Sequence, residues 1–175
     1  MAHTPTLYLM VGYPGAGKTT VSRYIQELTG AEHLWADHER NTMFQNPSHD
    51  HQENIELYTE LNRRARDLLH EGKSVIFDTN FNFYKDRKRL RIMAAKEDAD
   101  SVVVWVNTPI DVARERATQQ AEGQETRVWG NMPLHRFERI SQSLQPPEPA
   151  EQPITLDGRG LSREAVELAL KLHRA

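Results

Sequence analysis

The chain has 175 residues, no cysteine and a formal net charge of −3. A chain of this length can bury roughly 70% of its unfolded surface, which predicts one domain over residues 1–175. The lack of cysteine excludes disulfides and thiolate zinc sites. The weakly acidic balance argues against a protein that coats nucleic acid over its whole surface, although a local basic patch is compatible with it. No apolar stretch approaches the ~20 residues of a membrane span and no secretory signal is evident, so we expect a cytoplasmic protein without a membrane segment.

The first element in chain order is a buried strand that leads into a glycine-rich loop. Residues 7–11 form a continuous apolar run, and a helix with apolar residues at helical spacing is expected from Thr20 to Leu28. The pattern G-x-x-x-x-G-K-[ST] lies between them. The expected nucleotide-binding residues are Gly12, Tyr13, Pro14, Gly15, Ala16, Gly17, Lys18, Thr19 and Thr20.

Each residue type in this loop suits a nucleoside triphosphate. Glycines let backbone N–H groups turn toward phosphate oxygens, and the helix N-terminus adds partial positive charge. We expect Lys18 to reach the β- and γ-phosphates of ATP and Thr19 to offer a hydroxyl ligand to Mg²⁺. The alternative is a plain glycine turn, which would leave the Lys-Thr pair and the flanking strand and helix as coincidences.

Strand-like and helix-like segments alternate along the rest of the chain, which predicts an α/β fold with a doubly wound parallel sheet. Five strands, buried on both faces, are expected at residues 6–11, 34–36, 74–77, 101–106 and 154–156. A helix is expected from Glu53 to His70, with Gly72 as its C-cap. Another should begin at Thr108, where Thr108 can cap, Pro109 can occupy the first turn and Asp111 can complete a capping box. The proline-rich residues 145–153 are expected to space the last strand, because too few residues follow for a second core.

Two aspartates end predicted strands, where an open α/β sheet places its ligand crevice. Asp78, followed by Thr79-Asn80, can hold the metal side opposite Thr19, and its alternative role is a cap for the next turn. Asp37 can accept the proton of an attacking hydroxyl, and Arg40 can hold an anionic group of the acceptor. The alternative is a surface pair of Asp37 and Arg40.

These motifs resemble the P-loop kinases related to 5′-hydroxyl polynucleotide kinase, a superfamily that includes zeta-toxin-like and antibiotic phosphotransferases. The resemblance rests on the glycine-rich loop, on Asp37-x-x-Arg40 and on residues 75–82, and it spans about residues 6–145. It implies a P-loop kinase fold of five strands with a small helical lid at about residues 112–133. It also implies that Asp37 is the general base, that Arg40 and Asn80 contact the acceptor with it, and that Asp78 is the second acidic residue.

The resemblance further implies that the lid supplies a cation to the transferring phosphoryl group. The related kinases resemble one another in carrying two lid arginines four positions apart, but Gln120 stands four residues after Arg116. We therefore expect Arg127 or Arg116 to serve as the catalytic cation. The alternative for Arg114 and Arg116 is a solvated helix face.

Two other polar clusters can be explained either by a function or simply by exposure to solvent. The basic residues at 85, 87, 88, 89 and 91 can pair with phosphates or form a solvated helix side, and we favour the solvated side. His49 and His51 are more typical of surface residues than of a metal site.

The sequence thus predicts an ATP- and Mg²⁺-dependent kinase that transfers a phosphoryl group to a hydroxyl acceptor, either a nucleic-acid 5′-end or a small molecule. A nucleotide-binding regulatory ATPase that acts through a protein partner is the alternative. The sequence does not give the oligomeric state, and a monomer is compatible with it.

Overall fold

Five parallel strands form one sheet in the computed structural model, which describes residues 4–119 and 131–174. The strands are β1 (Thr6–Val11), β2 (Glu32–Trp35), β3 (Val75–Asp78), β4 (Asp100–Asn107) and β5 (Ile154–Asp157). They lie in the order β2-β3-β1-β4-β5, so β1 is central and pairs Leu7 with Val75 on one side and Ser101 on the other. The expected five-stranded parallel sheet is confirmed, although β2 begins earlier than predicted.

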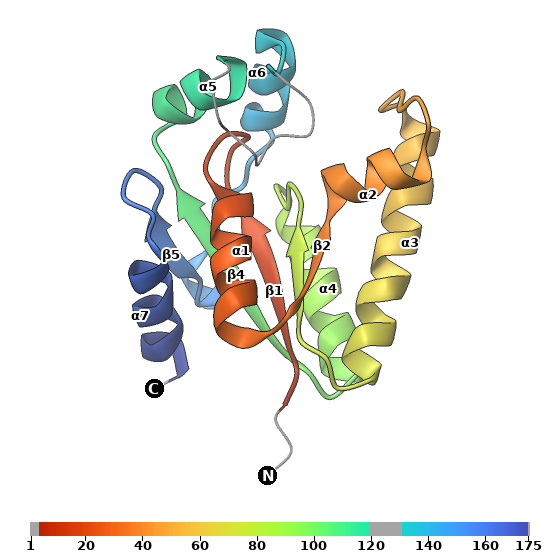
Figure 1. The fold of residues 1–175 in the computed structure, drawn as a ribbon, viewed down its shortest axis with the longest axis vertical. Coiled ribbons are helices and arrows are strands. Elements are labelled where there is room, and N and C mark those ends of the chain that lie inside the picture. The colour runs from red at the N-terminus through yellow and green to blue at the C-terminus, as the bar shows by residue number, and fades with distance from the viewer. Residues whose placement is uncertain (1–3, 120–130, 175) are drawn as a thin grey trace.

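Helices cover both faces of this sheet (Figure 1). They are α1 (Lys18–Thr29) and α7 (Arg163–Arg174) on one face, and α3 (His51–His70) and α4 (Tyr84–Lys96) on the other. Successive side chains of a strand point to opposite faces. Tyr8 and Met10 therefore pack in the core beneath α1 and α7, whereas Leu7 and Leu9 pack beneath α3 and α4. Strands buried on both faces explain the continuous apolar runs in the sequence.

Three shorter helices lie beyond the carboxyl ends of the strands (Figure 1). They are α2 (Ala36–Met43), α5 (Ile110–Thr118) and α6 (Leu134–Gln142). Phe137 of α6 packs with Ala113 and Ala117 of α5, and this cluster rests against Tyr13 of the glycine-rich loop. Helix α5, which opens the expected lid at residues 112–133, and α6, which follows that lid, are therefore packed onto the loop. Residues 120–130 of that lid lie outside the described residues.

Two helix ends show how local chemistry sets element boundaries. Helix α3 begins earlier than predicted because Asp50 caps it, accepting a hydrogen bond from the Glu53 backbone N–H (2.8 Å). Gly72, with φ of 78°, follows its last turn in the left-handed conformation. The predicted cap at Thr108 is wrong. Its hydroxyl donates instead to the Ala16 carbonyl (2.8 Å), so Thr108 ties the end of β4 to the glycine-rich loop.

The favoured interpretation of the basic cluster on α4 as one solvated side is also wrong, because Arg87 is fully buried. Its guanidinium donates two hydrogen bonds to the Glu151 carboxylate (2.7 and 2.9 Å) and one to the Phe81 carbonyl (2.9 Å). Glu151 belongs to a short 3₁₀ helix, η1 (Pro149–Glu151), within the proline-rich stretch. That stretch is therefore anchored to the fold rather than hanging free as a linker. Over the described ranges, no helix has both the length and the apolar character that crossing a membrane requires.

Candidate active site

The glycine-rich loop has a backbone that glycine alone tolerates without strain. Gly15 and Gly17 have φ of 79° and 108°, a region that other residues rarely adopt. A Cβ on Gly15 would lie 2.3 Å from the Ala113 carbonyl oxygen, and one on Gly17 would lie 2.5 Å from Leu161 Cδ1. At Gly15 the loop thus lies too close to the α5 backbone to carry a side chain, and at Gly17 a side chain would require Leu161 to move.

A cavity of about 980 Å³ opens at the carboxyl ends of the strands, above this loop. Most of the predicted site residues line it: Pro14, Gly15, Gly17, Lys18, Thr19, Thr20, Asp37, Arg40, Asp78, Asn80 and Arg116. The other loop residues act through their backbone. The Gly12 and Tyr13 carbonyls accept hydrogen bonds from Lys18 Nζ (2.9 and 3.0 Å), and the Ala16 carbonyl accepts from Thr108. The structure therefore brings together residues from four separate parts of the sequence.

The two predicted carboxylates sit in different surroundings. Asp78 is buried at the end of β3, and Nε2 of His33 on β2 hydrogen-bonds its Oδ2 (3.0 Å). Asp37, in the first turn of α2, opens to the cavity. Desolvation there, followed by the charge of Asp78, raises the pKa of Asp37 against the opposing effects of Lys18, Arg40 and Arg136. A carboxylate with a raised pKa is a better proton acceptor, which suits a general base.

The charges of both carboxylates act on Lys18. Desolvation lowers its pKa, while Asp78 and Asp37 act to raise it. The ammonium is held by loop carbonyls rather than by an acidic side chain. It is therefore free to exchange these carbonyls for phosphate oxygens.

The oxygen donors around Lys18 fit a magnesium ion. Thr19 offers a hydroxyl and Asp78 a carboxylate, and both line the cavity beside the loop. Mg²⁺ commonly uses one or two protein oxygens and completes its coordination with water and phosphate. The hydrogen bond to His33 occupies Oδ2 of Asp78 and leaves Oδ1. The part of the chain that the structure describes contains no group of three His, Asp or Glu side chains arranged to hold a metal.

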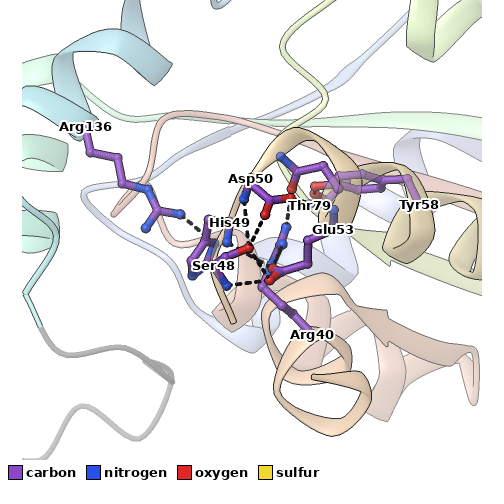
Figure 2. Close-up of polar contacts among 9 residues, drawn as sticks. Arg40, Ser48, His49, Asp50, Glu53, Tyr58, Thr79 and Arg136 are labelled. Atoms are coloured by element: carbon purple, nitrogen blue, oxygen red, sulfur yellow. Dashed lines mark hydrogen bonds and ion pairs between the residues drawn. The ribbon is translucent and has the colours of Figure 1, made fainter. Parts of the chain in front are cut away.

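Arg40 is held tightly within the fold, as Figure 2 shows. It is 5% exposed, pairs through Nη1 with Glu53 Oε1 and donates through Nη2 to Asn54 Oδ1 (2.6 Å). It therefore does not form the expected alternative, a surface pair with Asp37. Burial would raise the pKa of Glu53, but hydrogen bonds from Arg40, Ser48 and His49 outweigh it and lower this pKa to about 2. Glu53 is thus ionised and neutralises Arg40 over the whole physiological range of pH.

Sequence reasoning missed several residues of the cavity wall. Nη2 of Arg136, on α6, donates to Nδ1 of His49 in the segment before α3 (3.1 Å; Figure 2). The Tyr58 hydroxyl, on α3, hydrogen-bonds Thr79 Oγ1 (2.7 Å). The one available signal was the spacing of Arg136 and Arg139 on a short helix after Pro133, which places both on one face.

Of the two arginines predicted to act as the lid cation, the structure describes only Arg116. Nη1 of Arg116 donates to the Gly158 carbonyl (2.8 Å), so this arginine joins α5 to the segment after β5. That carbonyl lies beside the loop, because a Cβ on Gly158 would approach the Ala16 carbonyl oxygen to 2.9 Å. Arg127 and Gln120 lie outside the described residues.

Residues 7–147 match the profile of a family described as "AAA domain". The chain belongs to this family. Among sequence relatives, an uncharacterized protein of Mycobacterium tuberculosis, Rv2004c, is 29% identical over 132 residues, which are 69% of this chain and 26% of that protein. The chain therefore spans about a quarter of the length of this mycobacterial relative. A shikimate kinase from Acinetobacter baumannii is 30% identical over 152 residues, covering 81% of this chain and 72% of the kinase.

Solved structures show the same fold at lower sequence identity. A putative kinase from Chloroflexus aurantiacus superposes with a TM-score of 0.76 at 22% identity, covering 98% of this chain and 99% of that one. The APS kinase CysC of Mycobacterium tuberculosis, solved with AMPPNP and APS, gives 0.67 at 17%, covering 98% and 99%. A chain of the Pnkp1/Rnl/Hen1 RNA repair complex gives 0.67 at 19%, covering 82% and 45%. The AAA domain thus has a kinase-like P-loop NTPase fold.

Proposed function

We propose that this AAA domain is a kinase that uses ATP and Mg²⁺ to phosphorylate a hydroxyl group. The observation that carries this proposal is the shared cavity, in which the glycine-rich loop with Lys18 faces an open carboxylate with a raised pKa, Asp37. A site that only binds nucleotide has no need of a second carboxylate placed to accept a proton. The shikimate kinase and APS kinase among the similar proteins support this function.

The transfer follows from this arrangement. The acceptor hydroxyl oxygen bonds to the γ-phosphorus, the bond from the γ-phosphorus to the β,γ-bridging oxygen breaks, and ADP leaves with that electron pair. The hydroxyl proton passes to Asp37. Lys18 and the loop N–H groups hold the phosphates, and Thr19 and Asp78 would hold Mg²⁺, which neutralises developing charge when bound. A transition-state cation would come from Arg116 or Arg127, as the sequence suggests.

A small-molecule acceptor is better supported than a nucleic-acid 5′-end. Single strands are bound in grooves that track the backbone with basic and stacking side chains. The basic residues of α4 do not line the cavity, and Arg87 is paired with Glu151 in a buried salt bridge. The specific relationship to polynucleotide kinase therefore remains a prediction, with the RNA repair complex as its structural support.

The test is ATP turnover measured with and without acceptors. A panel of hydroxyl compounds, including sugars, sugar acids and a 5′-hydroxyl oligonucleotide, is incubated with γ-labelled ATP, and label in each acceptor is counted. A kinase transfers label to at least one acceptor class and hydrolyses little ATP without it. Slow hydrolysis that no acceptor stimulates, but that a protein partner changes, would favour the regulatory ATPase instead.

A further inference from the structure

The cavity wall formed by α6 carries two arginines that form no salt bridge with a carboxylate in the described part of the chain. Arg136 and Arg139, both on α6, line the cavity together with Asp37. Neither forms an ion pair with an acidic residue among residues 4–119 and 131–174. Arg40, the other arginine near Asp37, is neutralised by Glu53. Arg136 therefore interacts with Asp37 only through the longer-range charge effect on its pKa, and Arg139 lines the same cavity without a salt bridge to a described carboxylate.

His49 orients one of these groups without neutralising it. A guanidinium has no acceptor atoms, so the contact of Arg136 Nη2 with His49 Nδ1 requires that nitrogen to be unprotonated and the imidazole to be neutral. The surroundings agree, because desolvation, Arg136 and Arg40 all lower the pKa of His49. The backbone that carries this ring is held in turn, since the His49 backbone N–H donates to Glu53 Oε1 (3.2 Å; Figure 2).

Arg139 is the more exposed member of the pair. It lies three residues after Arg136, so both side chains project from the same face of α6. Phe137, buried between them in sequence, fixes this face by packing with α5. The helix thus presents two guanidinium groups to one region of the cavity.

We propose that Arg136 and Arg139 form an anion subsite for the acceptor, binding a carboxylate or phosphate group of the small molecule whose hydroxyl meets Asp37. This rests on the proposed kinase function and deepens it by naming the acceptor class. Paired guanidinium groups bind planar carboxylates and phosphates through several charge-assisted hydrogen bonds. The acceptor is therefore a small molecule with a hydroxyl and an anionic group rather than a neutral alcohol.

The walls around the subsite limit the size of this acceptor. The contact between Arg136 and His49 joins α6 to the segment before α3, so it bridges two walls of the cavity. A compact anion fits beneath such a bridge, whereas a continuous strand needs an open channel. The subsite thus selects a small molecule.

The experiment compares acceptors that differ only in their charge. Kinetic constants are measured with a hexose, the corresponding sugar acid, the hexose 6-phosphate and a 5′-hydroxyl oligonucleotide, using the wild-type protein, Arg136→Ala, Arg139→Ala and Arg139→Lys. Arg114→Ala is the control, because Arg114 is exposed on α5 and does not line the cavity. In parallel, binding of malonate and of inorganic phosphate is titrated into protein saturated with Mg²⁺ and a non-hydrolysable ATP analogue, so that the phosphate loop is already filled.

We expect a charged hexose to be preferred over the neutral one, and the sugar acid and sugar phosphate arms identify which anion the subsite takes. Arg136→Ala and Arg139→Ala should each raise the KM for that acceptor roughly 10- to 100-fold, with little change in the KM for ATP. Arg139→Lys should recover part of the loss, and Arg114→Ala should match the wild type. Because Arg139 is exposed, its variants test the subsite even if Arg136→Ala fails to fold.

The outcomes separate the subsite from the kinase assignment. Transfer to the neutral hexose as efficient as to both charged ones, or transfer to the oligonucleotide alone, would overturn the subsite while leaving a kinase. Malonate or phosphate binding that depends on Arg139, without transfer to any acceptor, would support the subsite and refute the kinase. Anion binding that is equal in all variants would show that α6 plays no part.

Discussion

Lys18 is the residue on which nucleotide binding depends most directly. Its ammonium is anchored by two loop carbonyls and interacts electrostatically with Asp78 and Asp37, and residues 12–20 contain no other basic residue. We expect Lys18→Ala to abolish turnover and weaken ATP binding. A non-hydrolysable analogue at about 100 times its Kd should stabilise the wild type by about 2.7 kcal/mol, or roughly 5–10 °C in Tm. The Lys18→Ala shift should be much smaller, whereas exposed Lys88→Ala should behave as wild type. Undiminished transfer by Lys18→Ala would show that phosphoryl transfer does not depend on this lysine.

Asp37 is the residue that separates catalysis from binding. Its carboxylate opens to the cavity, whereas Asp78, which is hydrogen-bonded to His33, is the carboxylate that we propose for the metal. Asp37→Asn should therefore keep ATP affinity and lower kcat by about 10²–10⁴-fold, the usual contribution of a positioned general base. Pre-steady-state measurement of turnover in the bound complex checks this, with Asp111→Asn, exposed on α5, as the matched control. If affinity falls and turnover of the bound complex stays constant, Asp37 and Asp78 exchange roles.

At the scale of elements, the strands and the glycine-rich loop were predictable because their signals are local. A continuous apolar run specifies a doubly buried strand, and the loop pattern specifies its own backbone. Apart from the shifted starts of β2 and α3, the features that the sequence did not predict concern partners distant in sequence. Arg87 meets Glu151 across 64 positions, Thr108 meets Ala16 across 92, and Arg136 meets His49 across 87. Composition and periodicity carry no information on such pairs, because the fold alone decides which charge finds which partner.

The pair of Arg87 and Glu151 gives a test at this scale. Arg87 is the one fully buried residue among the basic residues of α4. Removing one partner leaves an uncompensated buried charge, so Arg87→Ala should lower the free energy of unfolding by about 3–5 kcal/mol. Arg89→Ala, exposed on the same helix, should stay within about 0.5 kcal/mol of wild type. Urea denaturation measures both.

The double variant Arg87→Leu with Glu151→Leu removes both charges and fills the space. It should be more stable than Arg87→Ala, since apolar replacement of a buried pair is often nearly neutral. Equal loss in the single variants of Arg87 and Arg89 would show that the pair adds nothing to the anchoring of η1.

The whole molecule should lose stability in acid through the carboxylates that the fold holds ionised. Glu53 is the clearest case, since its pKa falls from 4.5 to about 2 on folding. A depressed folded pKa stabilises the fold fully above the unfolded value, and this contribution disappears as pH falls through the folded value. Asp37 acts in the opposite direction, because its raised pKa makes its protonation favour the folded state. The net balance therefore depends on buried pairs such as Glu53 with Arg40.

We accordingly expect the free energy of unfolding to fall as pH drops from about 4.5 toward 2, the window set by the unfolded and folded pKa values of Glu53. Glu53→Gln should start lower at neutral pH, because Arg40 loses its counter-charge, and should then lose less across this window. Glu56→Gln, exposed on the same helix, should follow the wild-type curve. Urea denaturation at a series of pH values provides the measurement. Parallel curves for wild type and Glu53→Gln would mean that Glu53 is not ionised in its pair with Arg40, and Arg40 would then carry an unneutralised charge into the cavity beside Arg136.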